Sequence, residues 1–416
     1  MTKTPTFRIA PSPTGHMHIG TLGMALCNMM LAKNMKGRFL LRIEDTDQSR
    51  EVEGAADALI KTFATFGIKF DNANDIPYQS TRGDIYKKYA DKLIASGKAY
   101  YDEGAVRFKA PEKTIIEWDD LIKGHMAIPG LERDPVIVKS NGLPPYNLAA
   151  TVDDYLMGTT HVLRGEEWLP STAEHIQLRT AVFGKDANWS YAHLPVICIL
   201  DDGNKRKLSK RKDKEALASY FLEQGYPVDA VIEYLLTIFN TDYELWRIAN
   251  PDTPWREFPF RFEKIGSNSP LFDWDKLNFI SANMIAKMSC TEINKAVKEF
   301  FADKITPKQF DDVCTILAVD RGSDRPRKDI AKFGDITTEF DYVFKPVKMT
   351  AQLEHYRELF LLATDKESWF ELVKKYCMDG GVKVRDYTQE IRKALTGREK
   401  STDLYTISKV LLGGTK

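Results

Sequence analysis

Two short segments, far apart in the chain, carry residues suited to phosphate chemistry. Residues 8–20 read RIAPSPTGHMHIG, and residues 207–211 read KLSKR. In the first segment, prolines stiffen a turn and glycines let the backbone approach an anion closely. His16 and His18 can donate hydrogen bonds to phosphate oxygens at this turn. In the second segment, lysine side chains could stabilise the charge that develops when a phosphate is attacked and pyrophosphate leaves.

The expected secondary structure would bring both segments to the edge of a sheet. We expect an apolar strand at 7–10, then the turn, then a helix whose apolar residues follow a 3.6-residue rhythm and which stops at Gly37. The N-terminus of that helix would offer free N–H groups to an anion. The basic segment follows an apolar run at 194–200. Alone, the first segment could be an ordinary turn and the second a solvated charged surface; together they favour a phosphate site.

Several blocks of the sequence, taken in order, resemble the glutamyl-tRNA synthetases, a family of class I aminoacyl-tRNA synthetases. The two segments above are similar to the signatures written HIGH and KMSKS. The other blocks are RIEDTD at 42–47, VDDYLMG at 152–158, HVLRGEEW at 161–168, QGYP at 224–227, LFD at 271–273 and LTGR at 395–398. The resemblance covers nearly the whole chain.

This resemblance implies an α/β Rossmann-type catalytic domain with an inserted α+β domain, followed by a mostly helical C-terminal anticodon-binding region. We expect the catalytic domain in residues 1–83 and 141–204, and a shortened acceptor-stem-binding insertion in 84–140. A stem-contact domain with the KLSKR loop would cover 205–285, and the anticodon-binding domain 286–416. The implied activity is ATP-dependent ligation of glutamate to tRNA-Glu through a glutamyl-adenylate, with ATP and Mg²⁺ as cofactors.

The resemblance also implies roles for single residues. The catalytic residues would be His18, Lys207 and Lys210. The ATP-binding residues would be Ser12, His16, His18, Gly20, Glu167, Trp168, Lys207, Ser209 and Lys210. The glutamate-binding residues would be Arg8, Ala10, Ser12, Glu44, Tyr146 and Arg164. Glutamate has two carboxylates and one ammonium, so the arginines suit the former and Glu44 the latter.

Contacts with tRNA are expected at Asp47, Arg211, Arg327 and Lys328. The last two belong to the run RPRK at 325–328, where clustered cations would suit a phosphate backbone, and a solvated surface turn is an equal alternative. The expected partners are tRNA-Glu and L-glutamate. The sequence leaves open whether tRNA-Gln is charged as well.

Three features depart from the family pattern. Gly23 replaces an arginine that is usual in its helix, and Ala150 stands where many relatives have asparagine or histidine. The insertion is short: only three residues separate the aromatic pair at 100–101 from the strand expected at 105–109. Many relatives have a Cys-x-Cys zinc knuckle there, so no zinc and no other metal site are expected.

Two alternative functions remain. A glutaminyl-tRNA synthetase would need a neutral amide pocket and a β-barrel anticodon region, whereas residues 280–416 have a helical pattern. A non-catalytic tRNA-binding relative would be expected to lack His18 or the two signature lysines, and all three are present.

Composition is consistent with an enzyme of several domains. The chain has 416 residues, 43% of them hydrophobic, and no formal net charge, so RNA binding would depend on local patches. The five cysteines are scattered without a CxxC pair, which favours reduced thiols. No apolar run suggests a signal peptide or a spanning helix. We therefore expect a cytoplasmic protein without a membrane partner, acting as a monomer.

Overall fold

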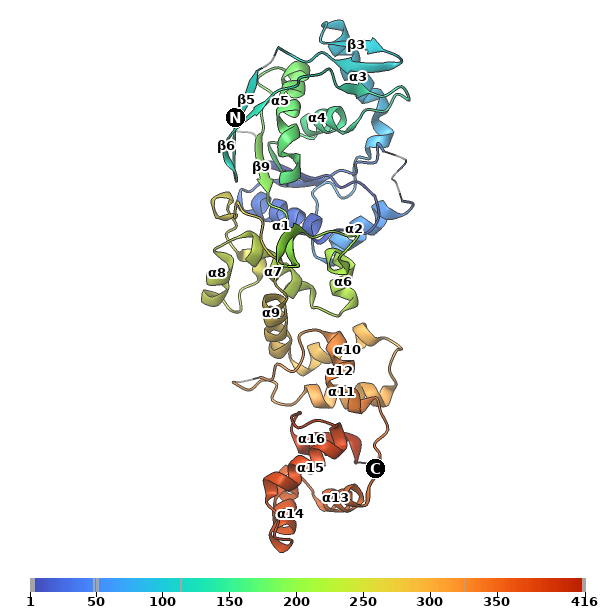
Figure 1. The fold of residues 1–416 in the computed structure, drawn as a ribbon, viewed down its shortest axis with the longest axis vertical. Helices are drawn as coiled ribbons and strands as arrows, with labels where there is room; N and C mark the ends of the chain where they lie inside the picture. Colours follow the sequence, from blue (N-terminus) through green and yellow to red (C-terminus); the bar gives the residue numbers. More distant parts are fainter. Residues whose placement is uncertain (1–3, 48, 50–51, 113, 325, 414–416) are drawn as a thin grey trace. The chain divides into compact units, whose positions relative to one another are not determined.

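The computed structural model describes residues 4–47, 49, 52–112, 114–324 and 326–413. Contacts between residues divide the chain into two compact units. Figure 1 colours the chain by residue number, so the segments of each unit can be found with its bar. The first unit is Met1–Phe221 with Val231–Asp273, and the second is Leu222–Ala230 with Trp274–Lys416. The boundaries of the four domains expected from the sequence stay predictions.

Parallel strands joined by helices form the centre of the first unit. The strand β1 (Thr6–Ile9) pairs in parallel with β2 (Arg38–Leu41), and the helix α1 (Ile19–Asn34) connects them. The strands β8 (His161–Gly165) and β9 (Ser190–Leu194) are also parallel to each other. A hydrogen bond of 2.9 Å from Thr160 N–H to the Thr6 carbonyl brings the start of β8 beside β1. This is the Rossmann-type arrangement that the resemblance in the sequence implied.

The segment between the two halves of this sheet contributes two further groups of strands. An antiparallel sheet consists of β3 (Ala99–Asp102), β4 (Ala105–Phe108) and β7 (Val136–Val138). Its apolar face shares a buried core with α3 (Gly83–Ala95), α4 (Tyr146–Leu156) and α5 (Leu169–Phe183). The hairpin of β5 (Ile115–Asp120) and β6 (Gly124–Pro129) was not expected. It extends the β8–β9 sheet, because Asp120 pairs in parallel with Tyr191 of β9.

The apolar run at 194–200 forms two strands rather than one. The strand β9 ends at Leu194, and β10 (Cys198–Asp201) begins after Pro195, which has no N–H for a ladder. β10 turns into β11 (Asn204–Lys207), so Lys207 ends a strand and only the residues after it lie in a loop. The remaining helices of the first unit are α2 (Ala55–Thr65) and α8 (Tyr243–Ala249). The helices α6 (Ala218–Glu223) and α7 (Val228–Phe239) each contain residues assigned to both units.

The second unit is helical, and no strand occurs among its described residues. Its α-helices are α9 (Trp274–Lys287), α10 (Cys290–Phe301), α11 (Pro307–Leu317), α12 (Ile336–Glu339), α13 (Ala351–Leu362), α14 (Lys366–Asp379), α15 (Val384–Thr396) and α16 (Leu404–Leu411). Capping boxes start α10 at Ser289 and α11 at Thr306. One apolar core runs through the unit, from Ile285 to Leu412.

None of the described helices combines the length and the apolar character that crossing a membrane requires.

Candidate active site

The first helix begins at His18, which acts as its N-cap. The Nδ1 atom of His18 accepts a hydrogen bond of 2.9 Å from the Gly20 N–H, and Nε2 lies 3.1 Å from the carbonyl oxygen of Leu208. These partners assign the proton to Nε2, where it is donated to Leu208. Burial lowers the pKa of His18, which keeps the ring neutral. His18 therefore joins the turn at residues 8–20 to the KLSKR segment.

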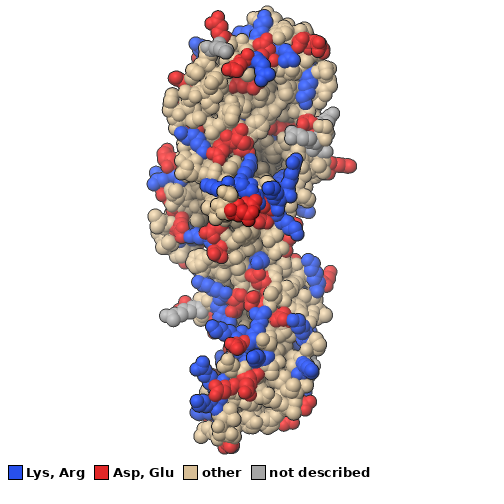
Figure 2. Space-filling view, in the orientation of Figure 1, with Lys and Arg blue, Asp and Glu red and all other residues tan. Residues whose placement is uncertain are grey.

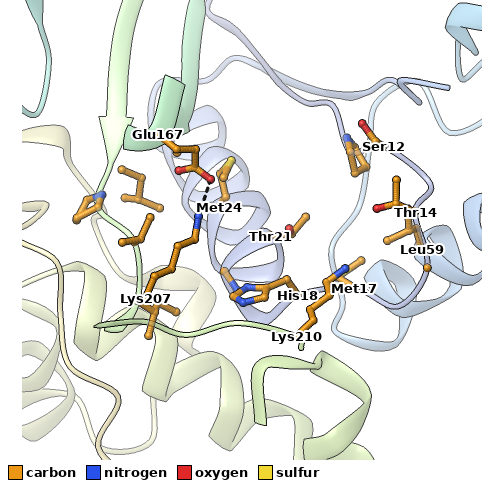
Figure 3. Close-up of a pocket in the computed structure, with 18 of the residues that line it drawn as sticks. Ser12, Thr14, Met17, His18, Thr21, Met24, Leu59, Glu167, Lys207 and Lys210 are labelled. Atoms are coloured by element: carbon orange, nitrogen blue, oxygen red, sulfur yellow. Dashed lines mark hydrogen bonds and ion pairs between the residues drawn. The ribbon is translucent and has the colours of Figure 1, made fainter. Parts of the chain in front are cut away.

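Both signature lysines extend over the same cavity, as Figure 3 shows. Lys207 Nζ lies 3.1 Å from the carboxylate of Glu167, and Lys210 Nζ donates to the carbonyl oxygen of His16. Partial burial lowers the pKa of Lys210. Asp213 fixes the loop by accepting a hydrogen bond of 2.8 Å from the N–H of Ser209.

This first cavity has a volume of about 300 Å³. The predicted residues that line it are Ser12, His18, Gly20, Glu167, Lys207 and Lys210. The sequence did not single out Met24 or Phe239, which add apolar side chains to the wall. An apolar wall, a helix N-terminus and two ammonium groups suit the base and phosphates of a nucleotide.

A second cavity, of about 460 Å³, shares Ser12 and Thr14 with the first. It is lined by Glu44, Tyr146 and Trp168 among others. Trp168 was expected beside ATP, but the structure places it here, with its ring centroid 4.4 Å from that of Tyr146. The two cavities are thus adjacent, as the binding sites of two reacting substrates must be.

Charged side chains are paired behind the second cavity. Arg8 is buried and makes two hydrogen bonds to Asp154, of 2.9 and 3.2 Å. Arg42 bonds both Glu44 and Asp154, each at 2.8 Å. Burial tends to raise the pKa of Asp154, but Arg8 and Arg42 lower it strongly, so Asp154 is a carboxylate. The sequence predicted that the Arg8 guanidinium binds a carboxylate of glutamate. In the structure, its Nε and Nη2 atoms already donate to Asp154.

Of the residues predicted to bind glutamate, Ser12, Glu44 and Tyr146 line the second cavity. Arg164 and Ala10 are not among the residues that line either cavity. Arg164 is buried and donates to the backbone oxygen of Trp168 at 3.3 Å. Ala10 follows β1, and Ala150 is buried in α4. Glu44 keeps a raised pKa, because its burial outweighs the stabilising effect of Arg42.

Two of the remaining predicted residues, His16 and Arg211, are on the surface. His16 is exposed and contributes its backbone oxygen, and Arg211 is exposed in the loop after β11. Figure 2 shows Lys and Arg side chains gathered near the hairpin of β10 and β11, with acidic side chains among them. Asp47 lines the second cavity.

The predicted RPRK contacts belong to the second unit. Arg327 is paired with Asp329 at 2.7 Å, and the Lys328 ammonium lies 5.7 Å from the ring centre of Phe279. Arg325 is outside the described residues. No group of three or more His, Cys, Asp or Glu side chains in the described chain could hold a metal ion.

The family model for the catalytic domain of class I tRNA synthetases (E and Q) matches residues 6–105 and 102–279. This chain belongs to that family. The synthetase is 35% identical to a glutamate–tRNA ligase of Clostridium perfringens (strain 13 / Type A), over 97% of this chain and 92% of the relative. It is 36% identical to the glutamate–tRNA ligase of Clostridium beijerinckii, over 97% and 91% of the two chains.

A solved structure supports the fold of this synthetase over its full length. It is a crystal structure of a glutamate tRNA ligase from Elizabethkingia meningosepticum in complex with its amino acid. The TM-score is 0.82 at 23% identity, and the match covers 98% of this chain and 97% of that chain.

Proposed function

We propose that this synthetase is a glutamate–tRNA ligase that activates L-glutamate with ATP and transfers it to tRNA-Glu. The observation that carries this proposal is the pair of adjacent cavities that share Ser12 and Thr14. One has the wall and cations for a nucleotide, and the other has the polar groups for an amino acid. The names of the relatives, at 35–36% identity over 97% of this chain, support glutamate as that amino acid.

The reaction would have two steps. In the first, a carboxylate oxygen of glutamate attacks the α-phosphate of ATP, the bond to the β-phosphate oxygen breaks, and pyrophosphate leaves. In the second, a hydroxyl at the 3′ end of tRNA attacks the glutamyl carbonyl and AMP leaves. Lys207 and Lys210 extend over the first cavity and would stabilise the charge that develops during the first step.

The N-terminus of α1, capped by His18, would receive the phosphates. Since the described residues contain no carboxylate and imidazole cluster for a metal, a Mg²⁺ ion would be held mainly by the phosphates of ATP. Among the glutamate contacts, Glu44 faces the second cavity and would pair with the ammonium group. The expected contacts of Asp47, Arg211, Arg327 and Lys328 with tRNA remain part of this proposal.

The glutaminyl enzyme is the alternative that must be tested directly. The described residues of the second unit are helical, which favours the glutamyl type over the β-barrel anticodon region of glutaminyl enzymes. The test is aminoacylation of purified tRNA-Glu and tRNA-Gln with labelled glutamate or glutamine. We expect tRNA-Glu to be charged with glutamate and not with glutamine, and the same assay shows whether glutamate is also attached to tRNA-Gln. Charging with glutamine, or no charging by a protein that binds tRNA, would overturn the proposal.

A further inference from the structure

A chain of buried polar side chains leads from the β5–β6 hairpin to Arg164. Asp120, at the end of β5, accepts a hydrogen bond of 2.6 Å from the Nδ1 of His193 on β9. His193 Nε2 accepts one of 3.1 Å from the Nε of Arg164 on β8. All three residues are at least nine-tenths buried. The proposed reaction uses Arg164 but leaves Asp120 and His193 without a role.

Hydrogen bonding fixes the proton of His193. Asp120 is an acceptor, because hydrogen bonds from His193 and two backbone N–H groups lower its pKa despite the opposing effect of burial. Burial lowers the pKa of His193, so the ring is neutral and carries its one proton on Nδ1. Nε2 is then an acceptor, as the Nε–H of Arg164 requires. The opposite tautomer would direct two N–H groups at each other.

Neutral groups occupy most of the Arg164 guanidinium. Besides His193, it donates to His175 Nδ1 at 3.3 Å, to Thr172 Oγ1 at 2.8 Å and to the Trp168 carbonyl at 3.3 Å. An arginine has five N–H donors, so one on Nη1 is left without a partner among the described residues. Arg164 also has no ion pair with a described carboxylate. Arg8, by contrast, is neutralised by Asp154.

The position of Arg164 relates this charge to the second cavity. Trp168 and Tyr146 line that cavity, and the His175 ring lies 5.4 Å from the Tyr146 ring between their centroids. Of the groups that accept hydrogen bonds from Arg164, Trp168 therefore lines the cavity and His175 lies against the lining residue Tyr146. Its guanidinium has no carboxylate partner among the described residues and has the geometry to bind a substrate carboxylate through two hydrogen bonds.

We propose that Asp120 and His193 are positioning residues of the glutamate site, which fix the guanidinium of Arg164 in the orientation that receives a glutamate carboxylate. This inference rests on the proposed function. It also gives the β5–β6 hairpin, which lies within the segment 84–140, a direct connection to the amino-acid site.

The test is Asp120→Asn. The Oδ1 atom of Asp120 accepts three backbone N–H groups, from Ile122, Lys123 and His193. An asparagine would keep its oxygen on these donors and place its NH₂ group toward His193 Nδ1. The proton of His193 would move to Nε2 and oppose the Nε–H of Arg164, as replacing a histidine's carboxylate partner selects the wrong tautomer elsewhere. Asp119→Asn is the matched control, because its side chain is 89% exposed on the same strand.

Steady-state exchange between ATP and pyrophosphate, with tRNA present, would be measured for each variant. For Asp120→Asn we expect the KM for glutamate to rise about 10- to 100-fold, by analogy with the loss of a group that orients a metal-binding histidine. The KM for ATP should change by less than about twofold. The control should leave both values unchanged. Equal increases in both KM values, or none, would overturn the inference.

Two substitutions of His193 keep the test decisive if Asp120→Asn folds poorly. Glutamine carries one donor and one acceptor and can serve both neighbours, so His193→Gln should keep most of the glutamate affinity. His193→Phe cannot, and should raise the KM for glutamate about 10-fold or more. Equal effects of the two would contradict a positioning role. A wild-type protein that does not activate glutamate would instead refute the proposed function.

Discussion

At the scale of single residues, the groups that would bind substrates already have partners within the protein. Lys207 contacts Glu167, Lys210 contacts the backbone of His16, and Arg8 contacts Asp154. When ATP binds, Lys207 and Lys210 would exchange these contacts for contacts with phosphate oxygens, and both side chains are exposed enough to move. Arg8 is buried, and breaking its pair with Asp154 would leave that buried carboxylate with Arg42 alone. The lysines are therefore movable parts of the site, and Arg8 is a fixed part.

Replacing Lys210 should affect chemistry more than binding. We expect Lys210→Ala to slow adenylate formation by about 10²–10³-fold, because one group that stabilises transition-state charge is lost. The affinity for glutamate should change little, since Lys210 lines only the first cavity. Exchange of ATP and pyrophosphate with tRNA present measures the rate. The exposed neighbour Lys212→Ala is the control. Normal rates in both variants would make the loop a surface patch only.

The protonation of His18 predicts a pH dependence of stability. Its pKa in the folded protein is lowered by burial, below an ordinary value of about 6.5. The neutral ring therefore stabilises the fold above that pH, and the contribution is lost as the pH falls. Asparagine can cap α1 but does not titrate. From pH 7.5 to 5.5 the thermal midpoint of wild type should fall more than that of His18→Asn. Parallel curves would contradict this assignment.

At the scale of elements, α1 and α7 approach each other closely at Gly23. A Cβ at this position would overlap the ring of Phe239, the last residue of α7. Phe239 also lines the first cavity. The glycine that departs from the family pattern thus has a physical reason in this chain, because it leaves room for an aromatic side chain in the wall of the first cavity.

A pair of substitutions tests this contact. Gly23→Ala should destabilise the protein by about 1–3 kcal/mol, as overpacking usually does, and should raise the KM for ATP. The double variant Gly23→Ala, Phe239→Leu replaces the ring by a smaller side chain. It should recover part of the lost stability and part of the lost ATP affinity, so the effects of the two substitutions would be non-additive. Gly83→Ala, at the start of α3 with open space around its Cβ position, is the control. Additive effects of the two changes would exclude direct contact.

The short insertion predicts a protein without zinc. The strands β3 and β4 are joined by Glu103 and Gly104 alone, with φ values of 48° and 81°. Such a pair forms a tight hairpin turn, and it leaves no residues for a zinc knuckle. Elemental analysis of the purified protein should find far less than one zinc per chain. A stoichiometric amount of zinc would contradict the prediction.

Local patterns made some elements predictable and left others hidden. The helix after the first turn was evident from its apolar rhythm, and the strand expected at 105–109 corresponds to β4. β5 and β6 were missed because all of their side chains except that of Asp120 are exposed or half-buried, and polar residues such as Glu117 and His125 interrupt the apolar pattern. The pairing of Asp120 with His193 joins residues 73 positions apart, and a single sequence has no signal for such a contact.

At the scale of the whole molecule, the chain has two compact units, and both candidate cavities lie in the first. The predicted contacts at Arg327 and Lys328 lie in the second unit. A tRNA bound to both would have to connect them, and its binding energy could complete the site for glutamate. The contacts of the two lysines with Glu167 and with the backbone of His16 are consistent with a free site that is not yet arranged for reaction.

We therefore expect glutamate activation to depend on tRNA. Exchange of ATP and pyrophosphate with glutamate alone should be near background, and it should rise strongly when tRNA-Glu is added. Because the insertion is short, the region after Lys214 and the helical second unit would supply much of this coupling. The double variant Arg327→Ala, Lys328→Ala should then need more tRNA-Glu to reach the same exchange rate, as the loss of phosphate contacts weakens RNA binding. The maximum rate should stay close to that of wild type, because neither residue belongs to the unit with the cavities. Full exchange without any tRNA would refute the coupling while leaving the ligase activity itself in place.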